Sequence, residues 1–112
     1  MGILEKLANR NAYPEKLRNG EQIHVRALSL DQLDRIDKLE PNLKTGFLIG
    51  CCLCTERGVP EIQQDKGEED AKFSERVLTD VKAVGMGTDT LREIQQAIGR
   101  IGRADVEELA KN

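Results

Sequence analysis

The segment from Ile23 to Ile62 constrains the fold more than any other part of the chain. It begins with apolar residues at alternate positions, which is the period of a strand with one buried face. A helical amphipathic pattern follows, and then a run that is apolar almost all round and stops at the polar turn Thr55-Glu56-Arg57-Gly58. No group of residues in this segment has the makeup of a catalytic site. The segment therefore predicts a small domain suited to packing and binding.

The predicted strand has apolar residues on one face and polar residues on the other. The apolar positions are Ile23, Val25 and Ala27. Asn19-Gly20, just before the strand, is a turn signal, so we expect this strand to be the second arm of a hairpin. His24 and Arg26 should point to the open face of the hairpin. A single histidine in that position is a solvent-facing strand residue rather than a metal ligand.

A helix should begin at Ser29, because Ser29 and Gln32 have the spacing of a capping box. Four apolar residues at helical spacing form the predicted buried stripe of this helix. They are Leu30, Leu33, Ile36 and Leu39. Glu40-Pro41 should end the helix, since a residue before proline avoids the α region.

The run from Leu43 to Cys54 is longer than a usual strand, so it is interpreted as a buried helix that becomes strand-like at its end. Gly46 and Gly50 lie four residues apart, which is a spacing that permits close packing on a neighbouring helix. The cysteines of this run are expected to be small apolar core residues. They are Cys51, Cys52 and Cys54.

The second half of the chain predicts a polar loop at residues 61–70 and then more helices. Residues with helical spacing follow the loop, namely Phe73, Val77, Leu78, Val81 and Val84. Gly85-Met86-Gly87 should stop this helix, and Thr88 should cap the next one. A seam of apolar residues then recurs at intervals of three and four, before Gly102 is expected to break the helix. The seam residues are Leu91, Ile94, Ile98 and Ile101.

These elements predict a mainly α (α+β) fold: a single domain over residues 1–112, with about four to five helices and one short N-terminal β-hairpin. Residues 1–20 are interpreted as a segment that either docks on the domain or stays flexible. Within it, residues 1–11 have the spacing of a short helix with one apolar face. Residues 104–110 are expected to add a last turn or two of helix.

Charge and composition argue against several classes of function. The net charge is −3 and the aromatic content is 3%. Duplex-binding surfaces are usually basic, and single-strand binders stack bases on aromatic rings, so nucleic-acid binding is disfavoured. Met1 to Leu7 is too short and too charged for a secretory leader. The longest apolar run, Phe47 to Cys54, is far shorter than the roughly 18 residues of a membrane span. We expect a cytoplasmic protein.

The residue types that carry chemistry do not form a site. An odd number of cysteines in one cluster does not make a disulfide framework, and their apolar neighbours disfavour a thiolate. A zinc site would need a second ligand pair at a distance, and His24 is the single histidine. Gly85-Met86-Gly87 lacks the lysine and the preceding strand of a phosphate-binding loop. We expect no enzymatic activity, no cofactor and no metal.

A protein partner is then the main expectation, and the seam is its candidate contact. The alternative, that the seam packs in the core, is at least as plausible from the pattern, and both can hold if a partner contacts an exposed edge of the same stripe. A helix-turn-helix around Gly102 is a minor alternative, in which Arg92, Arg100 and Arg103 would touch phosphate. The acids interspersed among these arginines weigh against it.

Three stretches resemble the tail assembly chaperones of long-tailed, siphovirus-like bacteriophages and prophages. The first, HVRALSLDQLDRI, is similar to the strand and acidic amphipathic helix of that family. The second, FLIGCCLCTERGVPEI, is similar to its apolar run closed by a polar turn. The third comprises the late helix LREIQQAIGRIG and the ending VEELAKN. Together they cover most of the chain from Ile23 to Asn112.

The resemblance implies a partner and a mechanism. A chaperone of this kind would bind the long, helical tape-measure protein, keep it soluble in the host cytoplasm, and help to recruit tail tube proteins. It would be absent from the mature virion. The alternative is a small phage structural component, of the head–tail connector or tail terminator type, which would persist in the particle. A small DNA-binding regulator is the third possibility.

Overall fold

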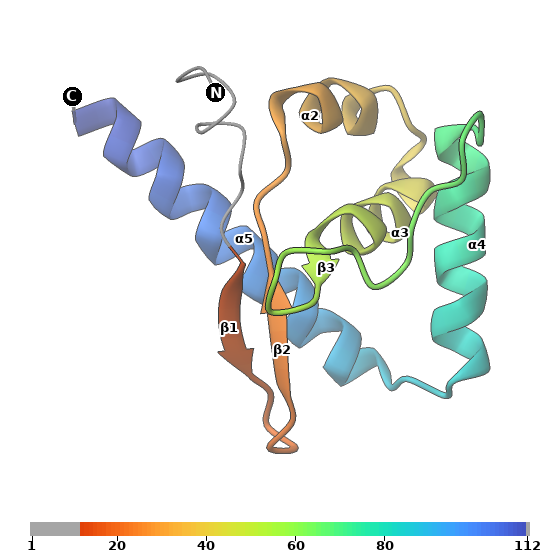
Figure 1. Cartoon of the computed structure of the whole chain (residues 1–112), viewed down its shortest axis with the longest axis horizontal. Helices are drawn as coiled ribbons and strands as arrows, with labels where there is room; N and C mark the ends of the chain where they lie inside the picture. The colour runs from red at the N-terminus through yellow and green to blue at the C-terminus, as the bar shows by residue number, and fades with distance from the viewer. Residues whose placement is uncertain (1–11, 112) are drawn as a thin grey trace.

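The computed structural model describes the backbone of residues 12–111 and the side chains of residues 12–101. In this part of the chain, four helices accompany one three-stranded antiparallel sheet, which confirms the predicted α+β class (Figure 1). The strands, in sheet order, are β1 (Tyr13–Lys16), β2 (Gln22–Val25) and β3 (Leu53–Cys54). The helices are α2 (Leu30–Asp37), α3 (Pro41–Cys52), α4 (Asp70–Ala83) and α5 (Thr88–Lys111).

The predicted hairpin is confirmed, and β1 is its first arm. Its turn is closed by a hydrogen bond of 2.9 Å from the Gly20 amide to the Leu17 carbonyl. Gly20 has a φ of 91°, whereas Asn19 does not have a positive φ. This is the pattern of a three-residue loop that ends in a left-handed glycine. Residues 13–20 of the segment expected to dock or stay flexible therefore form a strand and a turn, while residues 1–11 lie outside the described part.

Strand β2 lies between the other two strands, with Val25 opposite both Tyr13 and Leu53. Val25 is fully buried, as expected for the apolar face. The prediction that Arg26 faces open solvent is wrong. Its Nε donates to the Cys51 carbonyl at 3.0 Å, and one terminal nitrogen donates to the Gly58 carbonyl at 2.8 Å. Arg26 thereby ties the strand to the end of α3 and to the polar turn.

Helix α3 confirms the interpretation of the apolar run, including its short strand β3 at the end. It begins at Pro41, and proline is favourable in the first helical turn because its missing amide is not needed there. Helix α4 packs directly on the face of α3 that carries Gly46 and Gly50. A methyl group on Gly50 would lie 2.5 Å from Phe73 Cζ, so only glycine allows this approach.

The core lies between α3, α4, α5 and the sheet. Phe47 and Phe73 meet edge to face at its centre, with ring centroids 6.3 Å apart and an interplanar angle of 85°. All three cysteines are buried in this region, which confirms their assignment to the core. Ser74 is the buried polar side chain among the described residues, and its hydroxyl donates to the Leu43 carbonyl.

The end of α4 is as predicted, because Gly85 adopts a φ of 73° just after the last helical residues. The Gly85 amide donates to the Lys82 carbonyl, and the Met86 amide donates to the Val81 carbonyl. This pair of bonds is a Schellman motif, which satisfies carbonyls at the helix end.

Helix α5 differs from the prediction at both ends. Thr88 is its first residue rather than its cap, since the Gly87 carbonyl accepts the first helical bond from Leu91 at 3.1 Å. The helix also continues through Gly102 to Lys111 instead of breaking. Glycine within a helix costs only about 1 kcal/mol relative to alanine and keeps its backbone donor, so it weakens a helix without ending it.

Candidate functional site

The predicted seam on α5 faces the interior. Ile94, Ile98 and Ile101 are all buried, and Ile94 is only 2% exposed. Leu91 is partly buried against the same cluster. The seam thus packs α5 onto the core, which was the alternative left open by the pattern. The three isoleucines are not presented to a partner in this fold, because a contact through them would require α5 to leave the core.

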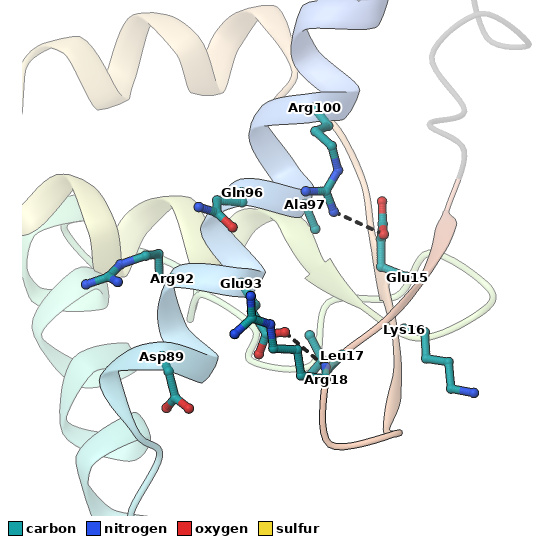
Figure 2. Close-up of a pocket in the computed structure, with 10 residues that line it drawn as sticks. All are labelled: Glu15, Lys16, Leu17, Arg18, Asp89, Arg92, Glu93, Gln96, Ala97 and Arg100. Carbon is teal, nitrogen blue, oxygen red and sulfur yellow. Dashed lines mark hydrogen bonds and ion pairs between the residues drawn. The ribbon is translucent and has the colours of Figure 1, made fainter.

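A shallow groove runs between the hairpin and the outer side of α5 (Figure 2). Its walls come from two sets of residues far apart in the sequence. The hairpin provides Glu15, Lys16, Leu17 and Arg18, and α5 provides Asp89, Arg92, Glu93, Gln96, Ala97 and Arg100. Two interactions cross the groove and hold the hairpin on α5. The Arg18 amide donates to Glu93 at 2.9 Å, and Arg100 pairs with Glu15 at 3.2 Å.

The groove has mixed charge and no nucleophile. Figure 2 shows Arg100 and Glu15 pointing toward each other, whereas Lys16 extends away from the groove. The turn at Gly102 that a helix-turn-helix would need is absent, because α5 is continuous there, and Arg92 and Arg100 lie on this one helix. The side chain of Arg103 lies outside the described residues. The contacts across the groove attach the hairpin to α5, and the mixed charge of its lining does not favour the binding of an anion.

The outer face of α2 carries Leu30, the most exposed large apolar side chain among the described residues, and the sequence pattern did not predict this exposure. Leu30 is 83% exposed and Leu33 is 45% exposed, although both were predicted to belong to a buried stripe. Only Ile36 and Leu39 of that stripe pack against the core cluster. The capping box is present as predicted, with Ser29 and Gln32 bonded reciprocally, so α2 is a well-formed helix with two leucines facing solvent.

Arg35 connects α2 to the rest of the domain. Its guanidinium forms a two-pronged pair with the Asp70 carboxylate, at 3.0 Å from Nε and 2.6 Å from a terminal nitrogen. A further bond of 2.8 Å reaches Gln64, and the guanidinium lies over the Phe47 ring at 5.4 Å from its centroid. Because planar pairing and stacking both fix the guanidinium, Arg35 sets the orientation of α2.

The Arg35–Asp70 pair also shifts the acidity of both groups. Hydrogen bonding from Arg35 holds the pKa of Asp70 below its ordinary value, opposed by partial burial and assisted by Gln64. The same bond raises the pKa of Arg35. In the polar loop, hydrogen bonding from Arg76 and from the Asp65 amide lowers the pKa of Glu68. The loop at residues 61–70 is therefore held to the start of α4 by charged contacts.

We expect the protein to lose stability in acid, in part through Asp70. The pKa of this carboxylate is lower in the folded state than in the unfolded chain, so its contribution is fully present above about pH 4. It is lost as the pH falls through the folded-state pKa. Asp70→Asn should cost about 1 kcal/mol at neutral pH, which urea unfolding would measure. The variant should also lose less stability than the wild type between neutral pH and pH 3 or so.

Asp65→Asn is the matched control, since Asp65 lies in the same loop and its side chain is exposed. It should keep the acid response of the wild type. If Asp70→Asn and the wild type lost stability in parallel as the pH fell, Asp70 would not be a source of the acid sensitivity.

Within the described residues, no group of three or more histidine, cysteine, aspartate or glutamate side chains is placed to hold a metal ion. None of the helices in that same region has the length and apolar character needed to cross a bilayer. Comparison of the chain with known protein families, curated proteins and solved structures found no match.

Proposed function

We propose that this protein is a phage tail assembly chaperone that binds the tape-measure protein and keeps it soluble until tail tube subunits arrive. The observation that carries the proposal is the pair of solvent-facing leucines, Leu30 and Leu33, on an ordered acidic helix. Soluble proteins present contiguous apolar surface mainly where they bind partners. The resemblance of the Ile23–Ile62 segment to the chaperone family supplies the identity of the partner.

The physical demands of that task suit a domain of this kind. A tape-measure protein exposes long apolar helix faces before the tube surrounds it, and such faces aggregate unless they are covered. A small domain with a modest apolar face binds one such segment weakly, and many copies along a long partner produce strong overall coverage. Weak individual contacts also allow tube subunits to displace the chaperone as they polymerise.

Co-expression with the tape-measure protein of the same phage tests this function. We expect the tape-measure protein to be mostly insoluble alone, and to become soluble and to co-purify with this chain when the two are produced together. An unrelated acidic protein of similar size is the control for non-specific solubilisation. A tape-measure protein that stays insoluble beside this chain would contradict the proposal.

Purified virions separate the chaperone from a structural component. A chaperone should be absent from the particles, whereas a connector or tail terminator would be present in stoichiometric amounts. Mass spectrometry of density-purified particles measures this directly. Finding the chain in the virion would move the assignment to a structural role.

A further inference from the structure

We propose that the outer face of α2 is the docking surface, and that it binds an amphipathic partner helix whose apolar stripe is flanked by lysine or arginine. This inference rests on the proposed function and adds to it the surface used and the chemical class of the segment bound. It follows from the placement of α2 rather than from the seam on α5, which is buried.

Two leucines and two aspartates share this face. Leu30, Leu33, Asp34 and Asp37 stand at positions i, i+3, i+4 and i+7, which lie on one side of a helix. All four are exposed. The leucines supply apolar contact area, and the carboxylates lie beside them on the same face. This combination matches a helix that presents apolar residues along one line and cations beside it.

The charge of the face selects among possible occupants. A second copy of this chain docked through the same face would bring Asp34 and Asp37 near their own counterparts, and like charges at close range cost free energy. Nucleic acid and anionic membranes are repelled for the same reason. A basic amphipathic helix is the occupant for which both the leucines and the aspartates contribute favourably.

The face is held in place before any partner arrives. Arg35 points to the opposite side of α2, where it pairs with Asp70 and stacks on Phe47. Ile36 and Leu39 pack on the core from the same inner side. Because the inner side is anchored, docking on the outer side needs no rearrangement of α2, and little conformational entropy is lost on binding.

Two variants of α2 test the proposal. The tape-measure protein is immobilised after the co-purified chain has been removed, and the binding of each variant to it is measured by biolayer interferometry. The double variant Leu30→Ser/Leu33→Ser should bind about tenfold more weakly or worse, since it removes the apolar contact. The double variant Asp34→Asn/Asp37→Asn should bind several-fold more weakly at low salt, with the difference shrinking at high salt. Both changes are on solvent-facing positions, and circular dichroism should show wild-type helix content.

Each variant has a matched control elsewhere on the surface. Val84→Ser removes a side chain that is 75% exposed and lies just after the last residue of α4. This C-terminal end of α4 lies far from α2 in Figure 1. Glu56→Gln/Glu75→Gln makes the same change in net charge at two exposed acids outside α2. Both controls should bind like the wild type. If the double leucine variant proves poorly folded, the single variant Leu30→Ser replaces it in the test, because Leu30 is 83% exposed.

The outcomes separate this inference from the proposed function. Wild-type protein that fails to bind the tape-measure protein would overturn both. Wild-type binding that survives both α2 double variants would overturn the docking surface, while the binding itself would still support the chaperone role. A dimer that the leucine variant dissolves would instead assign the face to a second copy and overturn the proposal.

Discussion

Ile94→Asp is expected to unfold the protein. Ile94 is 2% exposed and lies in the core cluster, so the substitution removes a large apolar side chain and places a carboxylate among apolar neighbours. Loss of the apolar side chain alone costs about 2–5 kcal/mol, and a buried unpaired charge adds several more. The sum is comparable to the total stability of a small domain, about 5–15 kcal/mol. Circular dichroism should show loss of the native helix signal, and no cooperative urea transition should remain.

Gln96→Asp is the control for Ile94→Asp, because it introduces the same charge on the exposed side of the same helix. It should change stability by only a few tenths of a kcal/mol. A folded Ile94→Asp protein with near-wild-type stability would mean that α5 does not pack as described. It would also restore the seam as a candidate partner contact, since its side chains would then be accessible.

Gly46→Ala is expected to destabilise the protein by about 1–3 kcal/mol, which is the usual cost of overpacking a filled core. The added methyl would fall well inside van der Waals contact of the Ser74 backbone oxygen, and 2.9 Å from Leu78 Cγ. A backbone oxygen within a helix cannot move aside, so α3 and α4 must separate. Gly50→Ala should cost a similar amount, because its methyl would meet the ring of Phe73 and a methyl of Val77, and both side chains are buried in the packed core. Urea unfolding monitored by circular dichroism measures the free energy of unfolding of the wild type, Gly46→Ala and Gly50→Ala.

Gly99→Ala is the matched control for the glycine substitutions. Gly99 lies within a helix, and a methyl there would meet nothing within 4 Å. The change should therefore stabilise the protein, by up to about 1 kcal/mol, through helix propensity alone. Equal effects of Gly46→Ala and Gly99→Ala would show that close approach of α3 and α4 does not govern the role of Gly46.

Elements specified by residues close together in the sequence could be predicted. The Ser29–Gln32 capping box, the turn at Gly20 and the helix stop at Gly85 each depend on hydrogen bonds within a few residues. The helix from Pro41 was predictable because a long apolar run must be buried. The spacing of Gly46 and Gly50 correctly indicated a close neighbour, although not that the neighbour would be α4.

The candidate docking face could not be predicted, because the sequence does not say how far a helix stands from the core. The stripe of α2 has the helical period, yet only its later residues, Ile36 and Leu39, reach the core cluster. Leu30 and Leu33 remain outside because the helix is anchored through Arg35, whose partner Asp70 is distant in sequence. Local hydrogen bonds and apolar period thus determined the elements of this protein. Contacts between distant residues decided which apolar faces were buried and which stayed exposed, because burial depends on what lies opposite a side chain.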